Sequence, residues 1–209
     1  MDEIKKDQDW CTAMHEAGHF IFFLRALIMH FGRKGAKKAA LSLPELTITL
    51  ERRWHAENVR KKRVRHARFR AAERSQKLGL NAEEEFLISA GGLAIDVITG
   101  RRTKDNRLIL NKLAETYEVA KARFGFPYKV IVKDDMTKSI TYLMATRGKL
   151  ISSSEFLSEI MALVKSLTRK EENLLNEVAK DLIEGLRTKD AQGEGEIVLN
   201  LLPYVKRFL

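Results

Sequence analysis

Apolar residues recur with a helical period through most of the chain. The first such stretch is expected to begin at Asp9 or Thr12, either of which could cap a helix, and to end by Gly32. Arg33–Ser42 is expected to follow it as a basic connector. Only 3 prolines occur in 209 residues, so few positions interrupt these helical patterns. The pattern therefore predicts a mainly α fold.

One segment has a different period. Leu46, Ile48 and Leu50 alternate with threonines, which is typical of a half-buried strand. We identify no other convincing strand, because the following segment 51–77 is rich in Ala, Arg and Lys and is expected to be helical in part. The predicted fold class is mainly α (α+β), a helical domain with a small β-sheet or hairpin.

The next apolar helix has clear start and stop signals. Asn81 followed by Glu84 forms a capping-box pattern, and Gly100 ends the run. The pair Gly91–Gly92 lowers helix propensity inside this run, so we expect another helix to approach closely there.

Further helices are expected in the second half of the chain, and they lead to a division into two domains. A core with a basic insertion at 51–77 is expected over residues 1–150, and a helical subdomain packed on it over residues 151–209. Residues 128–150 are ambiguous, and within them 128–132 could be a strand or the start of a loop. The expected helices are 103–124, one opening at Ser154, one from the Thr168/Glu171 capping box to Leu186, and a short one after the loop 190–195.

Net charge, cysteine content and the lengths of the apolar stretches indicate the expected cellular location. The net charge is +10, and the segment 51–77 holds eleven Lys and Arg against three Glu. The single cysteine, Cys11, cannot form an intramolecular disulfide, and no secretory signal pattern opens the chain. The longest apolar stretch, 19–31, contains Arg25 and is too short to span a bilayer. We therefore expect a cytoplasmic protein without a membrane span, and Cys11 as a small buried residue.

The first helix carries the pattern HExxH at His15, Glu16 and His19. Residues four apart lie on one helix face, so both imidazoles can reach one zinc ion, and Glu16 is placed to take a proton from a metal-bound water. The surrounding helix is largely apolar, where unpaired polar groups are costly. A catalytic zinc site also needs a third protein ligand, which this motif does not supply.

Three blocks of the chain resemble one family. Residues 13–19 (AMHEAGH), 91–96 (GGLAID) and 99–105 (TGRRTKD) are similar, in order and approximate spacing, to segments of the peptidase domain of FtsH-type ATP-dependent zinc metalloproteases. The resemblance implies a zinc endopeptidase with His15, His19 and Asp105 as metal ligands and Glu16 as general base. Asp96 is the reserve ligand, although its position matches a family glutamate that supports rather than binds the metal.

The chain departs from that family in its accessory parts. It has no phosphate-binding GxxxxGK[ST] loop and no membrane span, so it resembles the peptidase domain standing alone. We therefore expect cleavage of unfolded or flexible proteins, either unaided or with a separate ATPase. The strand 46–50 is expected to hold an extended substrate by edge pairing. The family forms hexameric rings, but the missing ATPase favours a monomer or small oligomer here, and the sequence leaves self-association open.

An alternative is a non-enzymatic binding module. In this alternative the basic segment 51–77 binds nucleic acid or an acidic protein. A simpler explanation of its charge is that the segment is a solvated insertion. An intact Glu16 favours the enzyme, because binding alone does not require a base. His30, His55 and His66 are expected outside the metal site, and the pair Asp134–Asp135 is expected to form a solvated turn.

Overall fold

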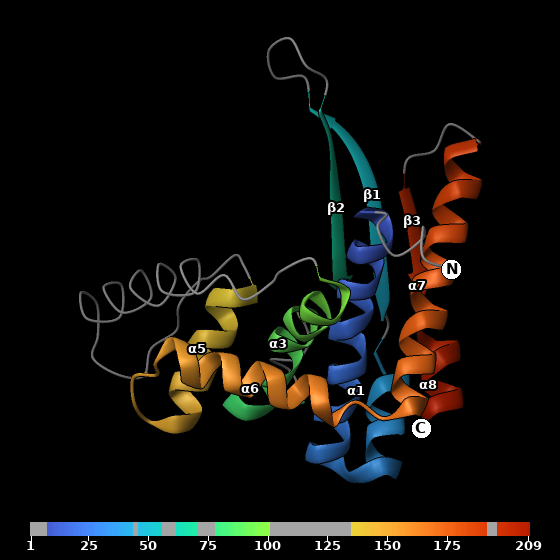
Figure 1. Ribbon diagram of the computed structural model, residues 1–209. Coiled ribbons are helices and arrows are strands. Elements are labelled where there is room, and N and C mark those ends of the chain that lie inside the picture. The colour runs from blue at the N-terminus through green and yellow to red at the C-terminus, as the bar shows by residue number, and fades with distance from the viewer. Residues whose placement is uncertain (1–7, 44–45, 56–61, 71–77, 101–134, 192–195) are drawn as a thin grey trace.

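The computed structural model describes residues 8–43, 46–55, 62–70, 78–100, 135–191 and 196–209. The described part is mainly helical with one small antiparallel sheet (Figure 1). Its elements are α1 (Gln8–Leu41), β1 (Thr47–His55), β2 (Lys62–Arg70), α3 (Ala82–Thr99), α5 (Asp135–Arg147), α6 (Ser153–Ser166), α7 (Arg169–Ala191), β3 (Glu196–Asn200) and α8 (Leu202–Phe208). The mainly α class with a small sheet is confirmed.

Helix α1 runs through the middle of the molecule, and its residues 11–24 are all buried. Phe20, Phe23 and Leu24 belong to a core shared with the sheet, α7 and α8. Phe22, on another face of the same helix, belongs to a second core shared with α3, α5 and α6. All four side chains are fully buried, as expected for a helix that is hydrophobic all round. The expected metal motif therefore lies on the most enclosed element of the described fold.

Gly32 breaks α1 as predicted, with φ 66° and ψ 167°, but the chain does not continue as a connector. Helical conformation resumes and runs to Leu41, so the expectation of a non-helical Arg33–Ser42 is wrong. Ala36 and Ala40 are fully buried in the first core, and this packing stabilises the second half of the helix.

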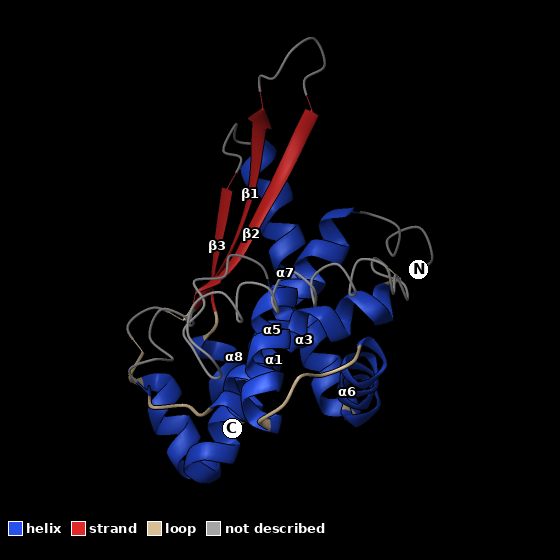
Figure 2. Ribbon diagram, turned by 90° about the vertical axis from the view of Figure 1, so that its left-hand side faces the viewer, coloured by secondary structure: helices blue, strands red, loops and turns tan. Residues whose placement is uncertain are grey.

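The sheet has three strands in the order β2-β1-β3, and both pairings are antiparallel. Ile48 pairs with Phe69 on β2 and with Leu199 on β3. The strand predicted at 46–50 is confirmed, but it was expected to be the only one. Figure 2 shows β1 and β2 continuing as a two-stranded ribbon beyond the end of β3.

The prediction of partial helix in segment 51–77 is wrong where the structure describes that segment. Residues 51–55 extend β1, and Lys62–Arg70 form β2, with Thr47 opposite Arg70 and His55 opposite Lys62. Cross-strand pairing overrides the helix propensity of an Arg- and Ala-rich sequence. Strand β3 was also missed, since only a short final helix was expected after the loop 190–195.

Helix α3 begins and ends as its sequence predicts. The side chain of Asn81 accepts from the backbone N–H of Glu84 at 3.0 Å, and the Glu84 carboxylate accepts from the N–H of Asn81 at 2.7 Å. Gly100 closes the helix in the left-handed conformation, with φ 72°. Ser152 and Glu155 form the capping box of α6, two residues before the predicted start at Ser154. Thr168 and Glu171 form the predicted capping box of α7.

The predicted helix 103–124 and the segment 128–132 lie outside the described residues. Helix α7 extends past the predicted end at Leu186 to Ala191, and the short final helix is confirmed as α8. Both hydrophobic cores combine residues from before and after position 150. The predicted subdomain thus packs on the N-terminal part, while the boundary itself stays a prediction. None of the described helices has the length and hydropathy needed to cross a bilayer.

Candidate metal centre

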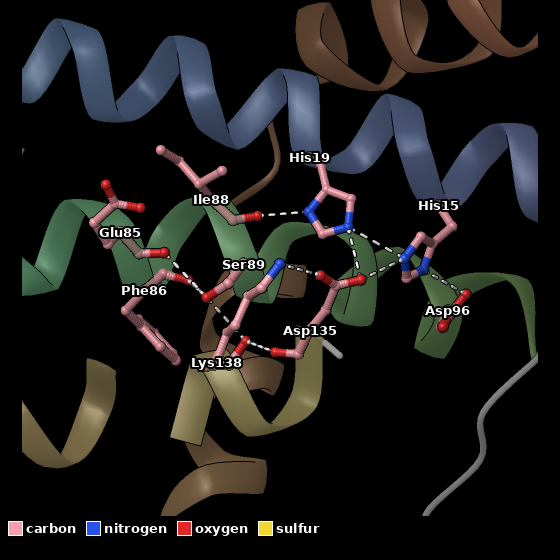
Figure 3. A network of polar contacts seen from close by, with 10 residues as sticks. His15, His19, Glu85, Phe86, Ile88, Ser89, Asp96, Asp135 and Lys138 are labelled. Carbon is pink, nitrogen blue, oxygen red and sulfur yellow. Dashed lines mark hydrogen bonds and ion pairs between the residues drawn. The ribbon is translucent and has the colours of Figure 1, made fainter. Parts of the chain in front are cut away.

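The site is built from three helices, as Figure 3 shows. Helix α1 contributes His15 and His19, α5 contributes Asp135, and α3 lies beneath both imidazoles. The two histidines are buried, with 8% and 6% of their surfaces exposed, whereas the side chain of Asp135 is 32% exposed. The cluster is therefore enclosed on the side of the helices and accessible on the side of Asp135.

Three ligand-type atoms meet at nearly equal distances. Nε2 of His15 lies 3.2 Å from Nε2 of His19, and Oδ2 of Asp135 lies 3.3 Å from each of these nitrogens. A tetrahedral zinc ion with ligand distances of about 2.0 Å holds neighbouring ligand atoms about 3.3 Å apart. The spacing of the two nitrogens and the oxygen therefore fits one face of a zinc coordination tetrahedron.

The opposite nitrogens of the imidazoles are held by α3. Nδ1 of His19 donates to the carbonyl of Ile88 at 2.7 Å, so in the neutral ring Nε2 carries the lone pair. Nδ1 of His15 lies 3.1 Å from Oδ1 of Asp96, which is almost fully buried. Metal-binding histidines are characteristically oriented in this way by a carboxylate or a carbonyl. Asp96 thus contacts the outer side of His15, away from the three meeting atoms.

Glycines allow α3 to approach these rings. A Cβ on Gly92 would lie 2.5 Å from Nε2 of His19 and 2.7 Å from Nε2 of His15. A Cβ on Gly91 would lie 2.8 Å from the carbonyl oxygen of Gly18, and one on Gly18 would lie 2.6 Å from Ile95. A side chain at Gly18 or Gly91 would meet the backbone of the facing helix and force α1 and α3 apart, whereas one at Gly92 would displace the imidazoles. The close helix approach predicted from the Gly91–Gly92 pair is confirmed, and it occurs at the imidazoles themselves.

Asp135 is held by the first turn of α5. The hydroxyl of Ser139 contacts the backbone carbonyl of Asp135 at 2.6 Å and the hydroxyl of Ser89 on α3 at 3.0 Å. Nζ of Lys138 lies 3.7 Å from Oδ1, the carboxylate oxygen directed away from the imidazoles (Figure 3). These contacts fix which oxygen of Asp135 faces the two histidines.

The cluster is arranged to hold positive charge. Burial lowers the pKa of His15, but hydrogen bonds to Asp135 and Asp96 outweigh it and raise the pKa to about 10. Burial acts on Asp135 in the opposite sense, yet the two histidines hold the pKa of that carboxyl well below its usual range. The same carboxylates would stabilise either a proton or a metal cation between these groups.

Glu16 is also buried, with 7% of its surface exposed. Glu16 directly follows His15 on α1, and its charge contributes to the raised pKa of His15. Among the described residues no group donates a hydrogen bond to it. A carboxylate beside the cluster can accept a proton from a water there.

The predicted site residues have different outcomes. His15 and His19 come together as expected, and Asp96 contacts Nδ1 of His15, while its role in supporting a metal stays a prediction. Asp105 lies outside the described residues, so its predicted role as third ligand stays a prediction. Asp135, which was expected to form a solvated turn, instead reaches both imidazoles, and that expectation is wrong.

No local signal in the sequence distinguishes Asp135 as a ligand. It opens α5, whose buried residues Met136, Ile140 and Leu143 pack against α3, the helix that carries the Gly91–Gly92 pair. An acidic residue in the first turn of a helix is usually explained by the helix dipole alone, which obscures a ligand role. The burial of Cys11 is confirmed, and His30 lies apart from the site, paired with Glu84 at 2.9 Å.

Comparison with protein-family models, with curated proteins and with solved structures finds no match to this chain. What the cluster does is therefore inferred from its own residues.

Proposed function

We propose that the protein is a zinc-dependent endopeptidase whose metal is held by His15, His19 and Asp135. The observation that supports this most directly is the meeting of two Nε2 atoms and one carboxylate oxygen at 3.2–3.3 Å, with both imidazoles held from behind. Two histidines and a carboxylate are a characteristic protein ligand set for a catalytic zinc site. Bound there, zinc would supply a Lewis acid that polarises a peptide carbonyl and makes water acidic near neutral pH.

The chain's own residues supply the remaining steps. A carboxylate oxygen of Glu16 accepts a proton from the attacking water, and the same group can return it to the leaving amine. Ile88 and Asp96 keep the two Nε2 atoms directed at the metal position. Gly92 leaves that position free of side-chain atoms from α3. Each function is therefore assigned to a residue whose burial or contacts are compatible with it.

The strand pairings leave no free edge for substrate on the strand 46–50. The strand 46–50 was expected to pair with substrate, but β1 has β2 on one edge and β3 on the other, so that expectation is wrong. Among the described strands, β2 pairs with β1 alone. The ring of Phe69 on β2 stacks with the imidazole of His19 at a centroid distance of 6.5 Å. We therefore assign the extended substrate to the edge of β2, beside the metal centre.

Cleavage of casein tests this function. The full chain loaded with zinc should hydrolyse casein, a chelator should abolish cleavage, and added zinc should restore it. His15→Ala should be inactive and should bind no zinc at the site. Cleavage that persists in the His15→Ala preparation would indicate a contaminating protease and would remove the support for a peptidase.

A further inference from the structure

The turn at Gly32 exposes an unusual combination of side chains. Gly32 has φ 66° and separates the two halves of α1, so residues 29–34 form the lower end of the molecule in Figure 1. Met29 is 48% exposed and Phe31 is 38% exposed, although both are apolar. The neighbouring side chains of Arg33 and Lys34 are exposed as well. We call residues 29–34 the Gly32 turn.

The charge around this turn has one sign over a long stretch. Between His19 and Leu43 the sequence has no acidic residue, and it has cations at positions 33, 34, 37 and 38 besides Arg25, whose charge is paired with Glu171 on α7. His30 points to α3, where it contacts the buried carboxylate of Glu84 at 2.9 Å. Arg33 and Lys37 also reach backbone carbonyls at the end of α8, at 3.4 and 3.5 Å. The surface of the turn is therefore apolar at Met29 and Phe31 and cationic beside them.

We propose that the Gly32 turn is a docking surface for an anionic lipid bilayer. A bilayer interface receives both kinds of side chain, because apolar groups enter the boundary of the acyl chains while Lys and Arg bind anionic headgroups. Either signal alone gives weak attachment, and stable binding requires both. Nucleic acid would match the cations but would give no reason for exposing Met29 and Phe31 next to them.

The location separates this surface from the metal centre. Gly32 follows His19 by 13 positions, which corresponds to about 20 Å along a helix. The β1–β2 ribbon lies at the opposite end of the molecule (Figures 1 and 2). Docking through the turn would leave both the ribbon and the site free, and the proposal does not depend on the peptidase activity.

Vesicle cosedimentation tests the proposal with the full chain. Vesicles of phosphatidylcholine with about one third phosphatidylserine should bind the protein, vesicles of phosphatidylcholine alone should bind it much less, and salt should weaken binding. The double variant R33S/K34S should lower the partition coefficient by about 25-fold, since each cation near the surface contributes about fivefold. The control K62S/R63S removes the same charge from β2 and should have a clearly smaller effect.

The apolar half of the surface is tested without a change in charge. M29S/F31S should lower binding by an order of magnitude, whereas Leu150→Ser, at a residue that is also 48% exposed, should leave it unchanged. Phe31→Trp should show fluorescence quenching by brominated lipids beyond that of the parent chain. Equal losses in R33S/K34S and K62S/R63S, or no loss in M29S/F31S, would overturn the proposal. Binding of a nucleic-acid duplex that R33S/K34S abolishes while vesicles stay unbound would do so too.

Discussion

Gly92 and His19 occupy positions that exclude any larger residue at 92: a Cβ there would lie 2.5 Å from Nε2 of the imidazole. The glycine is therefore part of the proposed metal centre although it contributes no ligand. It also explains why a helix interior keeps a residue that costs about 1 kcal/mol relative to alanine.

Gly92→Ala is expected to weaken zinc binding without destabilising the fold. Alanine favours the helix, but its methyl group must displace His15 or His19, so zinc affinity should fall by an order of magnitude or more while the melting temperature changes little. Isothermal titration with zinc and thermal unfolding of the metal-free chain measure the two effects. Unchanged zinc affinity in this variant would show that the imidazoles lie elsewhere.

Asp96→Asn tests the support behind His15. The amide keeps the shape of the side chain but loses the charge 3.1 Å from Nδ1 of His15. Zinc affinity should fall by about 10- to 100-fold, the range typical of residues that orient a metal ligand. Loss of all zinc binding would instead make Asp96 a direct ligand, as the sequence had kept in reserve.

Glu16→Gln is expected to keep zinc and lose catalysis. The amide cannot accept a proton, so the rate of casein hydrolysis should fall by about 10²- to 10⁴-fold with the metal content unchanged. Glu159→Gln, on α6, is a control because its carboxylate only makes a surface ion pair with Arg147. A Glu16→Gln protein with normal activity would exclude the proposed base.

Arg25 and Glu171 give a pH-dependent contribution to stability. Nε of Arg25 donates to Oε1 of Glu171 at 2.6 Å, Nη2 donates to Oε2 at 2.6 Å, and the glutamate is buried. Burial alone would raise the pKa of Glu171, but hydrogen bonds from Arg25 and Thr168 outweigh it and lower the pKa below its usual value. The folded-state pKa lies below the unfolded one, so this contribution is present above the unfolded pKa and is lost as pH falls through the folded one.

Glu171→Gln should therefore destabilise the protein at neutral pH and lose much of its effect in acid. Breaking one side of such a buried pair costs about 3 kcal/mol, and urea unfolding at neutral and acidic pH measures the difference. Glu184→Gln, which removes an exposed carboxylate 3.7 Å from Lys180, is the matched control and should have little effect at either pH. A pH-independent loss in Glu171→Gln would mean that packing, not charge, accounts for it.

Local signals in the sequence predicted much of the helical framework. The Asn81–Glu84 capping box and Gly100 fixed both ends of α3, because these signals act within one turn of the helix. The HExxH spacing predicted that His15 and His19 lie side by side, because residues four apart share one face of a helix. Gly91–Gly92 indicated close packing, although only the structure shows that the imidazoles are what α3 approaches.

Features that depend on distant contacts were missed. Strand β2 exists because Lys62–Arg70 pairs with β1 along its whole length, and a charged composition gives no sign of that pairing. Asp135 is separated from His15 by 120 positions and meets it only because α5 packs against α3. Its local setting, the first turn of a helix, is the same for any acidic residue that serves the helix dipole.

The central claim is that His15, His19 and Asp135 hold one zinc ion. Measuring zinc per chain by inductively coupled plasma mass spectrometry, after zinc loading and dialysis, tests it directly in the parent chain and in Asp135→Ala and Asp105→Ala. We predict about one zinc per chain in the parent and background zinc in Asp135→Ala, and Asp105→Ala measures whether the ligand role that the family resemblance implied for Asp105 contributes as well. Full, tightly bound zinc in Asp135→Ala, or no zinc in the parent chain, would contradict the account.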